Sequence, residues 1–302
     1  NDDLILMDPT STTGTRNSIS EFDKAILADL GYLISDYDYY GEPFAIATSQ
    51  GEQVNGSILN DILSGLGGDD FIFASDGDDE IYGGDGDDEL QGGRGADIIF
   101  GGADNDKLFA GEDDDELYGG DGEDSLQGGA GSDLIYGGLG NDKLFGENGD
   151  DILSGDGGDD QLTGGLGDDV FVINSGKADV WTGDGQDNIF VFSTKNETWI
   201  HDFDVANDTL TFVGSDYASS DAAFSSKYRE YSNYWSFDLP NDGVVYLSGT
   251  EDLPADTKIN LRQSWSIDYF LNKMPTITTT TSLTTDEDTA TSAIAFSGTD
   301  ID

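Results

Sequence analysis

An aspartate recurs at every ninth residue of this chain, thirteen times without a break. A large apolar side chain follows two residues after each aspartate, and glycines crowd the residues before it, as in the segment GGDGDD at 83–88. A low-complexity acidic tract would not keep both registers over so long a stretch. The thirteen positions are Asp61, Asp70, Asp79, Asp88, Asp97, Asp106, Asp115, Asp124, Asp133, Asp142, Asp151, Asp160 and Asp169.

This spacing predicts a coil of short strands joined by glycine-rich turns. Glycine tolerates positive φ, so it suits the turn. The three residues that begin after each aspartate suit a short strand whose middle side chain points inward. Two nonapeptides make one coil of 18 residues, so alternate aspartates stack in two ladders. Successive coils should lie about 4.8 Å apart, and six and a half coils would form a rod of roughly 30 Å.

The charge of the chain indicates what the aspartates bind. Sixty-three Asp and Glu against 12 Lys and Arg give a net charge of -51. A compact chain with that charge would repel itself strongly unless cations neutralise it. The hydrophobic content of 36%, with 16 Phe, 13 Tyr and 4 Trp, argues against wholesale disorder. The same charge argues against nucleic-acid binding, because phosphate would be repelled.

Calcium is the cation that the residue types favour. It takes six to eight hard oxygen ligands in flexible geometry, and aspartate carboxylates and turn carbonyls supply such oxygens. The chain has no cysteine, which excludes a thiolate metal site and disulfides. No apolar run approaches the roughly 18 residues of a membrane span.

The nonapeptide G-G-x-G-x-D-x-U-x, where U is a large apolar residue, resembles the repeat of the RTX (hemolysin-type) calcium-binding proteins. The resemblance implies an all-β fold, a right-handed parallel β-roll over residues 51–192, with one calcium between neighbouring turns of each ladder. Seven turns on one side and six on the other leave six and five gaps, so we expect about eleven ions. The implied ligands are the thirteen aspartates and Asp187, with carbonyls of the preceding turns.

The repeat departs from its pattern at several turns. Ala110-Gly111, Gly146-Glu147 and Gly155-Asp156 replace the double glycine, and Asp104 and Asp113 replace the second-turn glycine. We expect those sites to be weaker or distorted. The register then falters, because residue 178 is Ala and Asp179 comes one place late. Since Asp187 returns to register, the sequence predicts one more irregular coil and an end of the roll near Phe192.

The segment 1–40 differs in kind, and 41–50 is predicted to be a linker. A capping box at Ser18–Glu21 and apolar residues at helical spacing predict a short N-terminal helix from about Ser20 to Leu30. The stretch LMDP…ISEFDKAILADLGY resembles the C-terminal end of metzincin or leishmanolysin-like zinc metallopeptidases, which implies Met7 as the Met-turn residue. A helix that merely caps the roll is the alternative.

A peptidase site cannot be completed within this chain. The zinc site of those enzymes needs the H-E-x-x-H motif, which is absent, and one histidine cannot hold catalytic zinc. That histidine, His201, is predicted to be an ordinary surface residue. No catalytic residues are therefore predicted, and the chain itself is not expected to be an enzyme, although its parent protein could be a zinc metallopeptidase.

The C-terminal flank divides in two. Residues 193–273 alternate apolar and polar residues and resemble the segment that follows RTX repeats, so we expect a C-terminal β cap with Trp199, Phe203, Leu210 and Phe212 over the last coil. For Asp202, Asp204 and Asp208, a further calcium site and solvated acids are both open. Residues 274–302 resemble a Thr-rich linker and the truncated start of a cadherin-like or immunoglobulin-like domain, with Asp286, Glu287, Asp288 and Asp300 near an interdomain calcium.

A second period of 36 residues is nested in the repeat, because 78–109 recurs almost unchanged at 114–145. It places Tyr or Phe at an outward position of many strands. The favoured interpretation is that aromatics suit half-buried strands. The alternative is a surface for a glycan or another cell-surface partner.

These features predict a calcium-binding structural module of a secreted or surface-displayed bacterial RTX protein, exported by type I secretion machinery and folding when calcium fills the ladders outside the cell. Two alternatives stay open. The chain could be the secretion and stability part of a zinc metallopeptidase, or a segment of a large surface adhesin.

Overall fold

The structure, a computed structural model, describes residues 34–37, 43–46, 50–192, 197–213, 227–229, 234–238, 243–248 and 259–262. The chain divides into two compact units, Asn1–Gln263 and Ser264–Asp302, and every described residue lies in the first. The helix expected over 20–30, Met7 and the Thr-rich segment 274–302 lie outside the described residues. Within the described part, no helix is long and apolar enough to cross a membrane.

The described strands form two twelve-stranded sheets. Sheet A contains, in spatial order, β1 (Ile34–Tyr37), β2 (Pro43–Ile46), β4 (Ile62–Gly67), β6 (Glu80–Asp85), β8 (Ile98–Ala103), β10 (Glu116–Asp121), β12 (Leu134–Leu139), β14 (Ile152–Gly157), β16 (Val170–Ile173), β18 (Asn188–Phe192), β20 (Thr209–Val213) and β24 (Ile259–Arg262). Sheet B contains β21 (Lys227–Arg229), β22 (Tyr234–Asp238), β23 (Val244–Ser248), β19 (Glu197–Ile200), β17 (Lys177–Asp184), β15 (Asp159–Leu166), β13 (Lys143–Asn148), β11 (Ser125–Ala130), β9 (Lys107–Glu112), β7 (Glu89–Arg94), β5 (Phe71–Asp76) and β3 (Gln53–Asn55).

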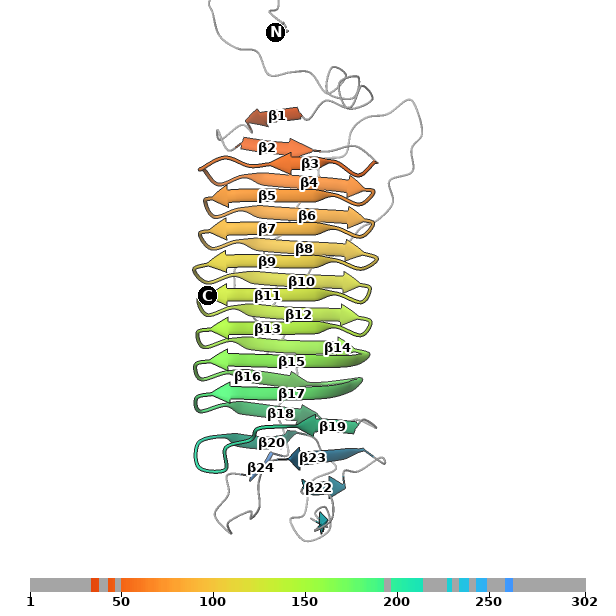
Figure 1. Cartoon of the computed structure of the whole chain (residues 1–302), viewed down its shortest axis with the longest axis vertical. Coiled ribbons are helices and arrows are strands. Elements are labelled where there is room, and N and C mark those ends of the chain that lie inside the picture. Colours follow the sequence, from red (N-terminus) through yellow and green to blue (C-terminus); the bar gives the residue numbers. More distant parts are fainter. Residues whose placement is uncertain are drawn as a thin grey trace, which may run out of the picture. The chain divides into compact units, whose positions relative to one another are not determined.

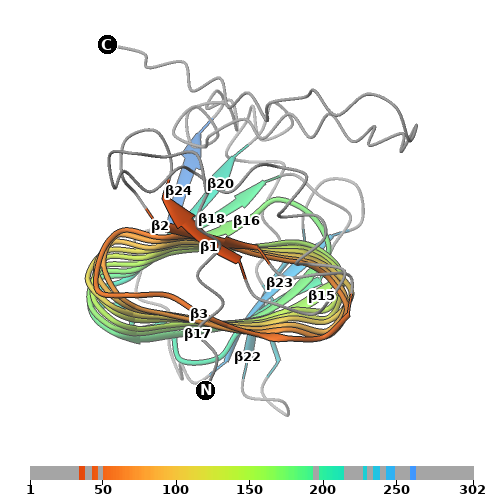
Figure 2. The same ribbon diagram turned by 90° about the horizontal axis from the view of Figure 1, so that it is seen from above.

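The chain alternates between the two sheets, so that each coil adds one strand to each of them (Figures 1 and 2). From β3 to β18 every pair of neighbouring strands in a sheet is parallel, and paired residues are 18 apart in the sequence. Leu117, for example, pairs with Ile99 on one side and Ile135 on the other. The predicted coil of two nonapeptides and the parallel β-roll are therefore confirmed.

The interior of the roll is a column of side chains, each two residues after an aspartate. Leu63 is 1% exposed and all the others are 0% exposed. They alternate with outward neighbours because successive residues of a strand point to opposite faces. These core residues are Leu63, Ile72, Ile81, Leu90, Ile99, Leu108, Leu117, Leu126, Ile135, Leu144, Leu153, Leu162, Phe171 and Ile189.

The turns keep one backbone path even where glycine is replaced. Gly84 has φ of 120°, and a β-carbon there would lie 2.2 Å from the carbonyl oxygen of Leu66 in the previous coil. Asp104, Asp113, Glu147 and Asp156 also take positive φ, between 64° and 82°. Non-glycine residues adopt this region at a cost. The unusual turns therefore follow the regular path under strain.

The roll extends beyond the limits expected from the repeat. Parallel strands β19, β20, β23 and β24 continue both sheets past Phe192, where the roll was predicted to stop. At the other end β2 pairs parallel with β4, inside the segment 41–50 that was predicted to be a linker. Both boundaries were wrong as limits of the sheets, because strand pairing uses the backbone and does not need the nonapeptide.

The predicted C-terminal cap is built as further coils. Leu210 and Phe212 are fully buried and Phe203 is 3% exposed, so they continue the core column. Trp199 points outward instead and stacks on Tyr246, with ring centroids 4.1 Å apart. Among the described strands at this end, β21, β22 and β23 pair antiparallel and form the last strands of sheet B.

Candidate metal sites

The predicted aspartates stand in two ladders, one leading into each sheet. Ladder 1 precedes the strands of sheet A, and ladder 2 precedes those of sheet B. Every one of the side chains is between 0% and 3% exposed. Ladder 1 contains Asp61, Asp79, Asp97, Asp115, Asp133, Asp151, Asp169 and Asp187; ladder 2 contains Asp70, Asp88, Asp106, Asp124, Asp142 and Asp160.

One carboxylate oxygen of each aspartate links neighbouring coils. The backbone N–H of Asp79 donates to Oδ1 of Asp97 at 2.8 Å, and the same bond joins each aspartate to the one 18 residues later. These twelve bonds measure 2.7–3.1 Å. They orient the twelve accepting carboxylates in the same way along the roll.

The second oxygen of these carboxylates is buried without a partner. Among the described residues, Oδ2 has no hydrogen-bond donor in Asp70, Asp79, Asp88, Asp97, Asp106, Asp115, Asp124, Asp133, Asp142, Asp151, Asp169 and Asp187. Asp61, in the first turn of ladder 1, differs because its Oδ2 accepts from the N–H of Ser57 at 2.5 Å. Burying an ionised oxygen without a donor or a cation is costly.

A glycine lies beside the free oxygen of most ladder aspartates, five residues before the aspartate; Ala74, Ala110 and Thr182 stand at this place before Asp79, Asp115 and Asp187. A β-carbon on Gly83 would lie 2.3 Å from Oδ2 of Asp88 and 2.6 Å from the carbonyl oxygen of Gly101, in the next coil. Gly119 repeats this arrangement with Oδ2 of Asp124. At these glycines a carboxylate oxygen and a carbonyl oxygen of the next coil therefore border one small space.

Burial raises the pKa of thirteen ladder carboxyls from the ordinary value of 3.8 to between about 6 and about 8. Loss of water is the largest cause, the backbone bond to Oδ1 opposes it, and neighbouring carboxylates add to it. The pKa is highest, about 8, for Asp106 and Asp115 in the middle of the roll. Without a metal ion, the carboxyls of the ladders therefore ionise less readily than ordinary aspartates do.

The donor set suits calcium. Within the described residues no three His, Asp or Glu side chains converge on one point, so a site made of side chains alone is not formed there. Calcium accepts backbone carbonyls beside one or two carboxylates. The free Oδ2 atoms and the glycine carbonyls are oxygens of both kinds.

The ladder also contains a residue that the spacing missed. Asp208 is 1% exposed, and its Oδ1 accepts from the N–H of Asp187 at 3.1 Å, as the next ladder residue would. Its Oδ2 accepts from the N–H of Asp204 at 2.7 Å. Asp208 lies 21 residues after Asp187, so a search for nines passes over it. The signal was the apolar Leu210 two residues later.

The acids near Asp208 differ from one another. Asp202 and Asp204 are both exposed. Asp202 accepts from the N–H of Thr182 in the neighbouring strand at 2.7 Å, and Asp204 accepts from the N–H of Ala206 at 2.9 Å. Of the two interpretations left open for Asp202, Asp204 and Asp208, solvated acids do not fit Asp208, because it is buried.

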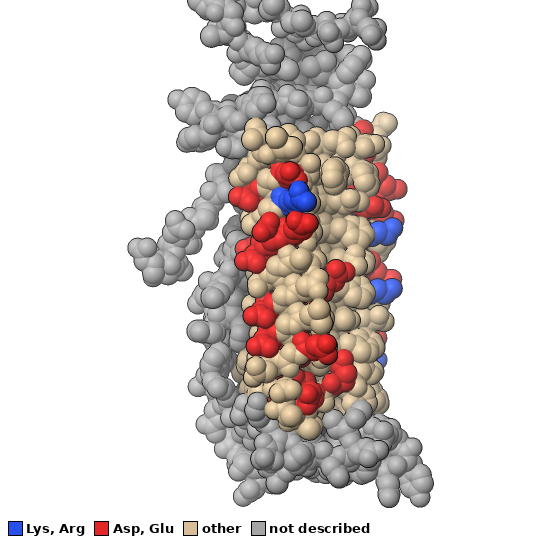
Figure 3. Space-filling model, turned by 60° about the vertical axis from the view of Figure 1, so that its left-hand side comes forward, with Lys and Arg blue, Asp and Glu red and all other residues tan. Residues whose placement is uncertain are grey.

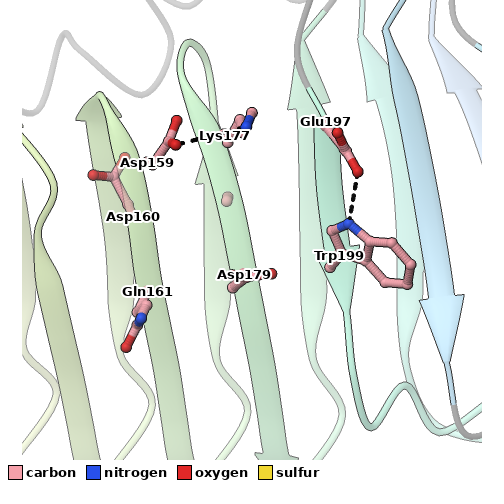
Figure 4. A pocket seen from close by; sticks show the side chains of 8 residues that line it. Asp159, Asp160, Gln161, Lys177, Asp179, Glu197 and Trp199 are labelled. Atoms are coloured by element: carbon pink, nitrogen blue, oxygen red, sulfur yellow. Dashed lines mark hydrogen bonds and ion pairs between the residues drawn. The ribbon is translucent and has the colours of Figure 1, made fainter.

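Ladder 2 is interrupted where Ala178 pairs with Asp160. A hollow of about 290 Å³ lies beside this point, lined by Asp159, Asp160, Gln161, Lys177, Ala178, Asp179, Glu197 and Trp199 (Figure 4). Asp159 pairs with Lys177 at 3.6 Å, and Glu197 accepts from Trp199 Nε1 at 3.0 Å. Its polar groups partly satisfy one another.

His201 was predicted to be an ordinary surface residue, but its side chain is only 31% exposed. Its ring stacks on Trp181 with centroids 4.3 Å apart, and Nε2 lies 3.3 Å from Oδ1 of Asp179. These contacts make it a packing residue of sheet B. His201 is the single histidine of the sequence.

We expect the metal-free roll to become more stable as the pH falls from about 8 to about 5. The ladder carboxyls bind protons more tightly when folded, with pKa of about 6 to about 8, than at the ordinary 3.8. The stability this gives is therefore fully present below that lower value and is lost as the pH rises through the folded values. Circular dichroism with a chelator should show more strand at the lower pH, and an equal signal at both would contradict this account.

A family model for the RTX calcium-binding nonapeptide repeat (4 copies) matches residues 55–90, 82–117, 109–144, 118–153 and 136–171. No curated protein matches the chain. Among solved structures, the extracellular lipase LipA from Serratia marcescens is similar, with 17% sequence identity and a TM-score of 0.26. That match covers 56% of this chain and 40% of the lipase chain.

The matched segments join into one stretch, and its two ladders and glycine turns are those described above. Residues 55–171 of this chain are therefore RTX calcium-binding nonapeptide repeats, folded as a parallel β-roll.

Proposed function

We propose that the roll is a structural module that folds when calcium fills the two aspartate ladders. The observation that carries the proposal is the row of twelve buried Oδ2 atoms without a donor among the described residues. The fourteen predicted aspartates would each give a carboxylate oxygen, and carbonyls of the adjoining turns would give the rest. About eleven ions would follow if each gap between turns is filled.

The surface charge supports the same proposal. Acidic side chains recur along the side of the roll shown in Figure 3, with few Lys or Arg between them. At a net charge of -51 the chain should resist compaction where calcium is scarce. A fold that waits for calcium suits export as an extended chain, so we infer secretion by type I machinery and an extracellular or cell-surface location.

The parent protein is a matter of proposal as well. Residues 1–40 would be the remnant of a metallopeptidase-like domain, 51–192 the repeat region, 193–273 its C-terminal region and 274–302 a linker with the start of a cadherin-like or immunoglobulin-like domain. The roll itself would be non-catalytic. A zinc peptidase and an adhesin are the two kinds of parent that this layout suits, and one large protein could be both.

Calcium titration tests the proposal directly. The chain in chelator at neutral pH should show little strand by circular dichroism, and calcium should induce a cooperative rise, because binding energy becomes folding energy. Magnesium at equal concentration should act weakly, since it demands small octahedral sites. Equal strand content with chelator and with calcium would overturn the proposal.

Two adjacent aspartates offer a matched test of the ligands. Asp151→Asn removes a buried charge with a free Oδ2, whereas Asp150→Asn removes an exposed charge one residue earlier. We expect Asp151→Asn to raise the calcium concentration at half-folding at least about tenfold, by analogy with losses at metal shells. Asp150→Asn should change it less than about twofold. Equal shifts would mean that only net charge matters.

A second candidate function, glycan binding, is favoured by one row of sheet B. Its outward side chains alternate between aromatic and polar from coil to coil, in the order Phe73, Gln91, Phe109, Gln127, Phe145, Thr163 and Trp181. Rings therefore recur every two coils, about 9.6 Å apart. A flat β-1,4-linked sugar chain presents the same ring face at nearly this interval, and amides and hydroxyls between the rings could bind its hydroxyl groups.

The aromatic stripe of sheet A is a poorer platform. Tyr82, Phe100, Tyr118 and Tyr136 occur in successive coils and stack, with centroids 4.9–5.4 Å apart and planes within 12°. Their faces cover one another, so a sugar could reach only ring edges. The favoured interpretation for this stripe is therefore strand packing.

Titration of the calcium-loaded chain with cellohexaose tests this second function. Binding should weaken about tenfold in Phe109→Ala, which loses a ring and its contact area. Tyr118→Ala, on the other sheet, serves as the control and should bind as the parent does. Absence of binding to the parent chain, or equal loss in both variants, would dismiss the glycan surface.

A further inference from the structure

At nine turns, the residue before the ladder aspartate makes a second connection between coils. The backbone N–H of Asp168 donates to Oδ1 of Asp150, 18 residues earlier, at 2.8 Å. The same bond occurs nine times, with lengths of 2.7–3.1 Å. The accepting side chains, here named clip residues, are Asn60, Asp69, Asp78, Asp87, Asn105, Asp114, Asn141, Asp150 and Asp168.

The clip residues and the ladder aspartates connect each turn to opposite neighbouring coils. The N–H of Asp168 donates back to Asp150, while the N–H of the next residue, Asp169, donates forward to Oδ1 of Asp187 at 2.9 Å. Two consecutive peptide groups that have no strand partner are thereby satisfied from the coil before and the coil after. Each turn is held on both sides.

The chemistry of the two sets differs. Three clip residues are Asn and six are Asp, so a neutral amide oxygen serves as well as a carboxylate. All nine bonds lie on the exposed side of the turn. A ladder aspartate instead buries a charge beside an oxygen without a donor. The hydrogen bond to the ladder aspartate of the following coil therefore depends on what neutralises that charge. The hydrogen bond to the clip residue of the preceding coil does not.

We propose that the clip residues are calcium-independent positioning residues, which hold each turn against the preceding coil and so present its carbonyls and its ladder aspartate to the ion. This inference rests on the proposed function but concerns residues that bind no ion. Because Ala96 and Ser132 occupy the same position and their side chains accept no such bond within the described part of the chain, the device is absent at two turns of ladder 1.

The test compares Asp150→Ala with Asp150→Asn in the full chain, since both remove one charge and only Asn keeps the acceptor. In the calcium-loaded protein, hydrogen exchange of the Asp168 amide should quicken about fivefold in the Ala variant, the loss expected for one hydrogen bond. It should stay near the parent rate in Asn. The calcium concentration at half-folding should rise in Asp150→Ala and not in Asp150→Asn.

Ser132 supplies the control and the reverse experiment. Ser132→Ala should change neither exchange nor calcium midpoint, whereas Ser132→Asn should slow exchange of the Asp150 amide by creating the missing clip. Equal effects of Asp150→Ala and Asp150→Asn, or an unchanged Asp168 amide in Asp150→Ala, would overturn the inference. A failure of calcium to fold the parent chain would instead overturn the proposed function, while leaving the amide comparison interpretable at acid pH.

Discussion

The roll depends on a carboxylate that is buried with one oxygen bonded and the other bare. In each regular turn Oδ1 accepts a backbone N–H from the preceding coil, which fixes the side chain, and Oδ2 is left beside glycine carbonyls. An ionised oxygen in such a place is unfavourable until a cation or a proton reaches it. Because the arrangement repeats along both ladders, the stability of the whole roll is tied to what fills these spaces.

The interior alone offers little to offset that cost. Each nonapeptide buries one large apolar side chain, such as Leu117 or Ile135, while nine residues lose their conformational freedom. The regular turns need glycine where the backbone approaches the neighbouring coil, as at Gly84, and this adds further flexibility to the unfolded chain. A narrow core, flexible turns and buried charges all favour the proposal that bound ions complete the fold.

Features that depend on local spacing could be predicted from the sequence. The ninefold recurrence of Asp and the apolar residue two places later were enough to place both ladders, the core column and the 18-residue coil, because side-chain direction alternates strictly along a strand. Features that depend on pairing across the roll could not. Asp208 enters ladder 1 after a gap of 21, since a longer loop can still bring its carboxylate beside Asp187. Likewise β2 and β20 join sheet A by backbone pairing with β4 and β18, outside the nonapeptide repeat.

The sequence by itself determined that this chain would coil, that two columns of aspartates would line its turns and that calcium is the cation they suit, because these follow from residue type and period. Only the tertiary structure decided which oxygen of each carboxylate is free, that Asp150 and Asp151 serve different neighbours, and that aromatic rings stack on sheet A but alternate with amides on sheet B. Those outcomes depend on the register between coils 18 residues apart, and register arises only when the coils stack.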